Sequence, residues 1–153
     1  MEHACEVLTW AARPTATIRT RTPVQDLPAI IGQSYAQIMP HIGAAGAQPV
    51  EPPMVVYHNR DMQDLDLEIG FVVSQAVPDK DDIQASQLPA GKAAACIHQG
   101  PYDDLAATYA RLEKWALAEG HTPTGIAYEF YISDPGDTPP DQLLTRIVFP
   151  LKS

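Results

Sequence analysis

Six stretches of the chain carry the alternating or β-branched pattern of β-strands. The clearest runs from Leu65 to Val73, where apolar residues alternate with Asp66, Glu68 and Gly70. That period of two predicts a half-buried strand. The six predicted strands are residues 15–20, 54–58, 65–73, 92–98, 126–133 and 143–149, and residues 83–88 predict a short additional one.

Two other stretches have apolar residues at helical spacing. The first begins near Leu27 and ends in the region of Gly43 to Gly46, and Pro40 is expected to kink or shorten it. The second runs from about Tyr102 to Glu119 and stops at Gly120. The predicted buried positions are Leu27, Ile31, Tyr35, Ile38 and Ile42 in the first helix and Leu105, Tyr109, Leu112, Trp115 and Ala116 in the second.

The order strand, helix, strand, strand therefore occurs twice. It predicts an α+β fold of duplicated β-α-β-β units, with an antiparallel sheet and both helices on one face of it. We expect one domain over residues 1–153, with halves of about 5–76 and 83–152. Two similar halves would meet across a pseudo-twofold axis, and a cleft at such an axis suits a small ligand.

Composition and charge limit the kinds of molecule that the protein is expected to bind. The 153 residues carry a net charge of -9, which argues against direct contact with nucleic acid or with an anionic membrane surface. The chain has no apolar run long enough to span a bilayer and no signal-peptide pattern, so we expect a cytoplasmic protein. Cys5 and Cys96 are predicted to be free thiols, and the His and Cys spacing indicates no metal site or cofactor.

Glu129 is the main candidate for chemistry, because it lies within Tyr128-Glu129-Phe130-Tyr131. Strand alternation places it with Ala127 and Tyr131, opposite Tyr128 and Phe130, so both faces are partly apolar. This favours burial of the carboxylate. A buried carboxylate with aromatic neighbours suits an organic cation, and it also suits general acid/base catalysis because burial raises a carboxyl pKa.

Several segments together resemble the GyrI-like small-molecule-binding family, which includes the effector-binding domains of bacterial AraC- and MerR-type multidrug-responsive regulators. They are Arg13-Pro14 and the segments 65–73, 88–92, 98–105, 128–135 and 145–151. The resemblance implies a duplicated strand-helix-strand-strand fold, with the family's pocket carboxylate at Glu129 and a pocket aromatic at Tyr57. We expect no helix-turn-helix module before the first strand, so a role in transcription regulation would need a partner that binds DNA.

Three functional hypotheses follow. The leading one is binding of a lipophilic, aromatic and in some cases cationic small molecule, for sensing or sequestration, by Glu129, Tyr57, Phe71, Tyr109, Trp115 and Tyr131. Core packing is the alternative role for each aromatic residue. The second hypothesis is a small-molecule hydrolase that uses Glu129 and Tyr57. The third is a protein partner, such as a DNA-handling enzyme that the domain restrains.

Overall fold

The computed structural model describes residues 3–152 and divides the chain into two compact units. We call residues 11–90 the α1 unit, and residues 3–10 together with 91–152 the α2 unit. Each unit contains four antiparallel strands and one long helix. No helix within residues 3–152 combines the length and the apolar character that a membrane crossing requires.

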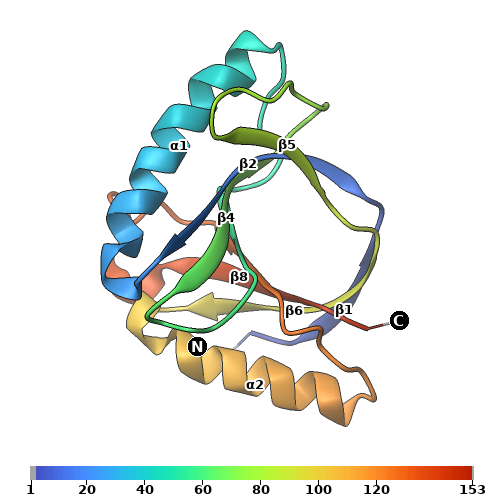
Figure 1. Cartoon of the computed structure of the whole chain (residues 1–153). Helices are drawn as coiled ribbons and strands as arrows, with labels where there is room; N and C mark the ends of the chain where they lie inside the picture. The colour runs from blue at the N-terminus through green and yellow to red at the C-terminus, as the bar shows by residue number, and fades with distance from the viewer. Residues whose placement is uncertain (1–2, 153) are drawn as a thin grey trace. The chain divides into compact units, whose positions relative to one another are not determined.

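The α1 unit holds α1 (Leu27–Ala44) and the strands β2 (Arg13–Thr22), β3 (Met54–Tyr57), β4 (Leu65–Val72) and β5 (Ile83–Leu88). Its strands lie in the order β5-β2-β4-β3. Helix α1 runs beside β2 and β4 (Figure 1). The apolar stripe of α1 explains this position, because Ile38 and Ile42 pack with Ala16, Ile18 and Phe71 of the sheet.

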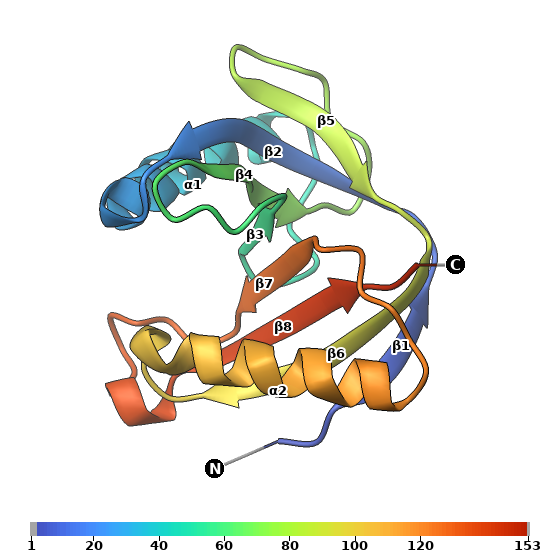
Figure 2. The same ribbon diagram turned by 60° about the horizontal axis from the view of Figure 1, so that its bottom comes forward.

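The α2 unit holds α2 (Leu105–Ala118) and the strands β1 (Glu6–Trp10), β6 (Gly91–Gln99), β7 (Ala127–Tyr131) and β8 (Leu144–Pro150). Its strands lie in the order β1-β6-β8-β7. Figure 2 shows α2 lying along this sheet. The helix turns Thr108, Leu112 and Ala116 inward, and all three are buried.

The two units share one topology, so the predicted α+β fold with duplicated, antiparallel β-α-β-β units is confirmed. Each unit also has an edge strand that comes from the other half of the sequence. β1, which the sequence pattern did not predict, pairs with β6, and β5 pairs with β2. The units therefore differ from the predicted halves of 5–76 and 83–152 at both edges.

One helix boundary differs from the prediction. The first helix ends as predicted within the region of Gly43 to Gly46, so Pro40 does not shorten α1, which continues to Ala44. The second helix begins at Leu105, because Tyr102–Asp104 forms a separate 3-10 turn after Pro101. This turn fixes where Tyr102 leaves the sheet of the α2 unit.

Gly70 lies where β4 leaves no room for a side chain beside β2. It pairs with Thr17 of β2, and a Cβ atom added to it would lie 2.0 Å from the Ala16 carbonyl oxygen. Because that neighbour is backbone, it cannot move aside without separating β2 from β4. A glycine is therefore required in the middle of this buried strand.

We predict that Gly70→Ala lowers the free energy of unfolding by more than about 2 kcal/mol, through overpacking against the β2 backbone. Gly32→Ala is the matched control, because Gly32 is exposed in α1 and an added Cβ meets nothing within 4 Å. The control should gain up to about 1 kcal/mol from helix propensity. Urea denaturation of both variants measures this, and equal stability of the two would contradict the close approach.

Candidate functional site

Glu129 lies in the middle of β7 and is only 5% exposed. Its neighbours Ala127, Tyr128 and Phe130 are also buried, so both faces of this strand are covered, as the alternation predicted. Glu129 pairs with Ile147 of β8, and Ile147 pairs with Cys96 of β6. Residues directly opposite one another share a face of the sheet. Glu129 thus lies on the same face as His98, which contacts α2.

Two tyrosine hydroxyls hold the Glu129 carboxylate. Tyr131, two residues along the same strand, donates to Oε1 at 2.9 Å. Tyr109 of α2 donates to Oε2 in a short hydrogen bond. One donor comes from the sheet and one from the helix, so the position of the carboxylate depends on how α2 packs against β7.

Aromatic rings surround this pair of hydrogen bonds. The Tyr109 ring packs against Phe149 with centroids 5.4 Å apart, and the Tyr131 ring packs edge-on against Tyr102 at 5.9 Å. Phe149 is fully buried, whereas Tyr102 is 39% exposed. The site therefore has a closed apolar side at Phe149 and an outer side at Tyr102.

Burial dominates the electrostatics of Glu129. Loss of solvent raises the pKa of its carboxyl above the ordinary value of 4.5, and the hydrogen bonds from Tyr109 and Tyr131 and the nearby His98 only partly oppose this rise. The ion pairs found within residues 3–152 involve other carboxylates. Within residues 3–152, no lysine or arginine pairs with Glu129.

The His98 ring supports the turn that carries Tyr102. Its Nε2 lies 2.9 Å from the Pro101 carbonyl oxygen and its Nδ1 lies 2.6 Å from the Thr108 hydroxyl. A carbonyl can only accept, so Nε2 carries a proton, and the Thr108 hydroxyl can donate to Nδ1. Gly100 has φ of 134°, a left-handed value that favours glycine, which explains the Gly-Pro-Tyr sequence at this turn.

One polar atom on this face has no partner. The Thr145 hydroxyl is fully buried and makes no hydrogen bond within the described part of the chain. Thr145 pairs with Tyr131 on one side and with His98 on the other. A buried unsatisfied hydroxyl costs free energy, so a water or ligand atom beside it would be stabilised.

The structure brings together three of the six predicted ligand residues, namely Glu129, Tyr109 and Tyr131. Trp115 lies half-buried on α2, six residues beyond Tyr109. Phe71 belongs to the α1 unit and packs against Tyr35 with ring centroids 5.1 Å apart, in the core beneath α1. This placement favours the packing interpretation of Phe71.

Tyr57 ends β3 in the α1 unit and is half-buried, so its proposed contact with the ligand stays a prediction. Sequence reasoning missed Tyr102 and Thr145 as members of the site. The Gly100-Pro101-Tyr102 motif was a usable signal for Tyr102, because the turn fixes the direction of that ring. The sequence did not mark Thr145 as a site residue, because any threonine on the buried face of an alternating strand looks the same in the sequence.

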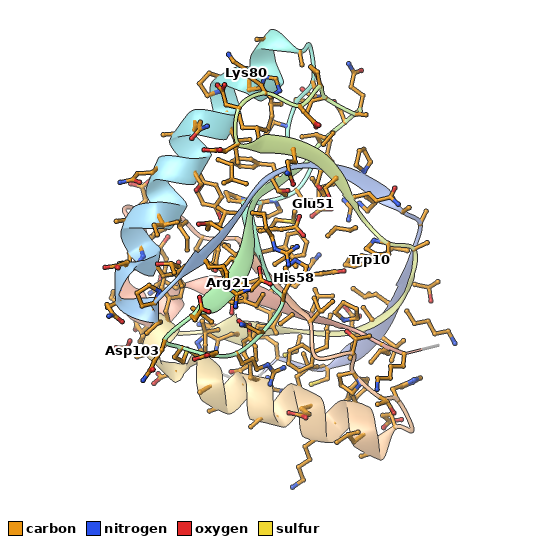
Figure 3. All side chains as sticks on the ribbon, in the orientation of Figure 1. Trp10, Arg21, Glu51, His58, Lys80 and Asp103 are labelled. Carbon is orange, nitrogen blue, oxygen red and sulfur yellow. The ribbon has the colours of Figure 1, made fainter. Side chains whose placement is uncertain are left out.

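Other polar clusters are internally paired. On the α1 unit, Arg19 binds Asp66 through two hydrogen bonds, Arg21 binds Asp64, and His58 lies 2.7 Å from Glu68. Figure 3 labels Arg21 and His58 of this cluster. Within residues 3–152, no group of three His, Cys, Asp or Glu side chains is placed to hold a metal ion.

A cavity of about 200 Å³ lies elsewhere in the α2 unit. It does not include Glu129. Its lining consists of His3, Ala4, Glu6, Ala95, Cys96, Ile97 and Arg146. We give the Glu129 site more weight, because it combines a buried charge with aromatic contacts, whereas this cavity is open and lined by no Phe, Tyr or Trp ring.

Comparison with known proteins identifies the family. The model of the GyrI-like small molecule binding domain matches residues 3–152. The chain belongs to the GyrI-like family. Its classification as a small-molecule-binding domain rests on this match, and no curated protein matches the chain in sequence.

Solved structures share the GyrI-like fold. The C-terminal domain of EcmrR has a TM-score of 0.80 at 22% identity and covers 100% of this chain and 99% of that one. A cryo-EM structure of an EcmrR–DNA complex has a TM-score of 0.84 at 22% identity, and there the match covers 99% of this chain but 58% of the EcmrR chain. This chain thus spans little more than half of the EcmrR chain.

Two further structures have more distant sequences. A structure described as a hydrolase from Listeria innocua has a TM-score of 0.67 at 17% identity, over 97% of this chain and 91% of that one. SAV2435 bound to tetraphenylphosphonium has a TM-score of 0.66 at 13% identity, over 100% and 95%. At these identities the likeness concerns the fold.

The raised pKa of Glu129 predicts how stability depends on pH. Between the unfolded carboxyl pKa and the higher folded value, the folded protein binds more protons, so stability falls as pH rises through that window. Glu129→Gln removes this loss. Its melting temperature should match that of the wild type near about pH 4 and exceed it increasingly toward neutral pH.

Thermal unfolding across this pH range measures the effect. Glu119→Gln is the control, because Glu119 is an exposed carboxylate at the C-terminal end of α2, the helix that carries Tyr109. That variant should follow the wild-type curve. A Glu129→Gln curve parallel to the wild type at every pH would contradict a raised pKa for this carboxyl.

Proposed function

We propose that this GyrI-like domain binds lipophilic aromatic cations at Glu129. The observation that carries the proposal is a buried carboxylate held by two tyrosines and without a lysine or arginine partner in residues 3–152. A desolvated charge of this kind is stabilised by a proton or by a cation. A hydrophobic cation supplies the charge without the large dehydration cost of a small inorganic ion.

The neighbouring rings supply the apolar part of the site. Tyr109 and Phe149 form its closed side, and the faces of aromatic rings attract cations. Tyr131 and Tyr102 form the outer side, and both are at least partly exposed. We propose that a ligand enters past Tyr131 and Tyr102, and that Tyr131 exchanges its hydrogen bond to Glu129 for contact with the ligand.

The Thr145 hydroxyl adds a position for a neutral hydrogen bond. It lies on the same face as Glu129, beside Tyr131 in the sheet register. An ordered water or a polar ligand atom at Thr145 would satisfy this hydroxyl. The site would then select ligands by charge at Glu129 and by area at the rings, with tolerance for different polar substituents.

The family supports this function. SAV2435, which shares the fold, has been solved with tetraphenylphosphonium, an aromatic cation. EcmrR, whose C-terminal domain shares the fold, forms a complex with DNA. We propose that this chain senses or sequesters its ligand in the cytoplasm, and that any control of transcription requires a DNA-binding partner or segment.

Tetraphenylphosphonium is a suitable probe, with triphenylphosphine oxide as the neutral aromatic comparison. Glu129→Gln should weaken binding of the cation by about 1–3 kcal/mol, or roughly 5- to 150-fold, and spare the neutral compound. Glu119→Gln should change neither affinity. Isothermal titration calorimetry measures both ligands on all three proteins. An equal loss for the two ligands would show that Glu129 acts through packing.

Hydrolysis of a reactive lipophilic compound is the second candidate function. A carboxyl with a raised pKa next to tyrosine hydroxyls can act as a general base toward water. A structure described as a hydrolase also shares the fold. The hydrolase hypothesis pairs Glu129 with Tyr57, which would donate a proton or a hydrogen bond to the leaving oxygen. Tyr109 or Tyr131 could serve instead, because both already bond to Glu129.

If turnover occurs, Glu129→Gln should nearly abolish kcat while the fold is kept. Tyr57→Phe should slow the reaction by about 10²-fold or less, because it removes one hydrogen bond and little volume. The rate should fall on the acid side as Glu129 takes up a proton. Mass analysis of bound compounds after incubation detects the products, and wild-type turnover by Glu129→Gln would remove this residue from the mechanism.

A further inference from the structure

The two cysteines of the chain lie next to each other in the α2 unit. β1 pairs with β6 so that Glu6 lies opposite Ala95, and continuing this register by one residue places Cys5 opposite Cys96. Residues opposite one another in an antiparallel pair point to the same face. The thiols also interact directly, since a hydrogen bond with the Cys5 thiol contributes to the raised pKa of Cys96.

The surroundings of the two thiols differ. Cys5 is partly exposed, and Nη1 of Arg111 lies 3.5 Å from its sulfur. The same guanidinium nitrogen donates to the His3 carbonyl oxygen at 2.8 Å, which fixes the segment before β1 against α2. Cys96 is only 3% exposed, and burial, together with the Cys5 thiol, raises its pKa to about 12.

We propose that Cys5 and Cys96 are a peroxide-oxidisable thiol pair that closes into an intrachain disulfide between the N-terminal segment and β6. The Cys5 thiolate attacks the terminal oxygen of a hydroperoxide, the O–O bond breaks, and an alcohol or water leaves. Cys5 is then a sulfenic acid. The Cys96 sulfur attacks the Cys5 sulfur, and the hydroxyl leaves as water with the Cys96 proton. Two thiols are oxidised by two electrons, and one peroxide is reduced.

The geometry supports the order of these steps. The first step needs negative charge on the Cys5 sulfur, and the positively charged guanidinium of Arg111 lies beside that sulfur. Exposure supports it too, because Cys5 is partly exposed whereas Cys96 is buried, so a peroxide in solvent reaches the Cys5 sulfur first. Opposed Cα atoms in an antiparallel pair lie roughly 4.5–5.5 Å apart, within the range that disulfides span.

The direct experiment treats the reduced chain with hydrogen peroxide in slight excess. The intact mass should fall by two hydrogen atoms, alkylation of both cysteines should be lost, and peptide mapping should link the Cys5 peptide to the Cys96 peptide. A thiol reductant should restore the starting mass. Because the bond closes a long loop, the melting temperature of the oxidised chain should rise by on the order of 10 °C.

Variants test the roles of the two sulfurs. In Cys96→Ala, which continues the run Ala93-Ala94-Ala95, dimedone should trap a sulfenic acid on Cys5 after peroxide. In Cys5→Ser, Cys96 should stay unmodified over the same time. Arg111→Gln should slow disulfide formation severalfold, and Arg111→Lys should recover part of the rate.

Three outcomes would overturn the proposal. Both wild-type thiols could remain open to alkylation after peroxide, the product could be a dimer linked between chains, or Cys96 in Cys5→Ser could react as fast as Cys5 does in Cys96→Ala. Each is read from the same mass spectra. None depends on ligand binding at Glu129, so this result and that of the ligand titrations are independent.

Discussion

The α2 unit depends on one constraint, a buried carboxylate that has no lysine or arginine partner within residues 3–152. Glu129 is kept in place by one hydroxyl from its own strand and one from α2. Tyr109 must therefore point toward β7, which fixes the rotation of α2 about its axis. The same rotation turns Thr108 toward His98 and Arg111 toward Cys5. One buried charge thus explains the contacts on both sides of the helix.

The turn after β6 completes the site from a different direction. Gly100 supplies a backbone angle that other residues rarely adopt, and Pro101 follows the end of β6 at Gln99. The Pro101 carbonyl oxygen accepts a hydrogen bond from His98. Tyr102 then lies over Tyr131, the residue that holds Glu129. The outer aromatic pair is consequently attached to backbone that has little freedom. A ligand entering here would displace side chains, while the frame behind them remains in place.

The sequence pattern predicted the parts of this arrangement that depend on local periodicity. Alternation around Glu129 was sufficient to predict its burial, and helical spacing was sufficient to place Tyr109 on an inward face. β1 was missed because Glu6–Trp10 is a mostly exposed edge strand, whose formation depends on β6, far along the chain. The pairing of Cys5 with Cys96 follows from that same strand and was hidden for the same reason. Contacts between residues far apart in the sequence cannot be predicted in this way, since strand and helix propensities describe only residues that are neighbours along the chain.

The charge of the site explains why one scaffold can suit both binding and hydrolysis, and it favours binding here. A general base must direct a lone pair at a water molecule, and each oxygen of Glu129 already uses one of its two lone pairs to accept a hydrogen bond from a tyrosine. Those bonds stabilise the ionised form, while burial opposes it and has the larger effect. A cation brought into contact removes the cost of the buried charge without breaking both hydrogen bonds. A neutral water nucleophile leaves that cost in place, because the ionised base that hydrolysis requires is the form that burial disfavours.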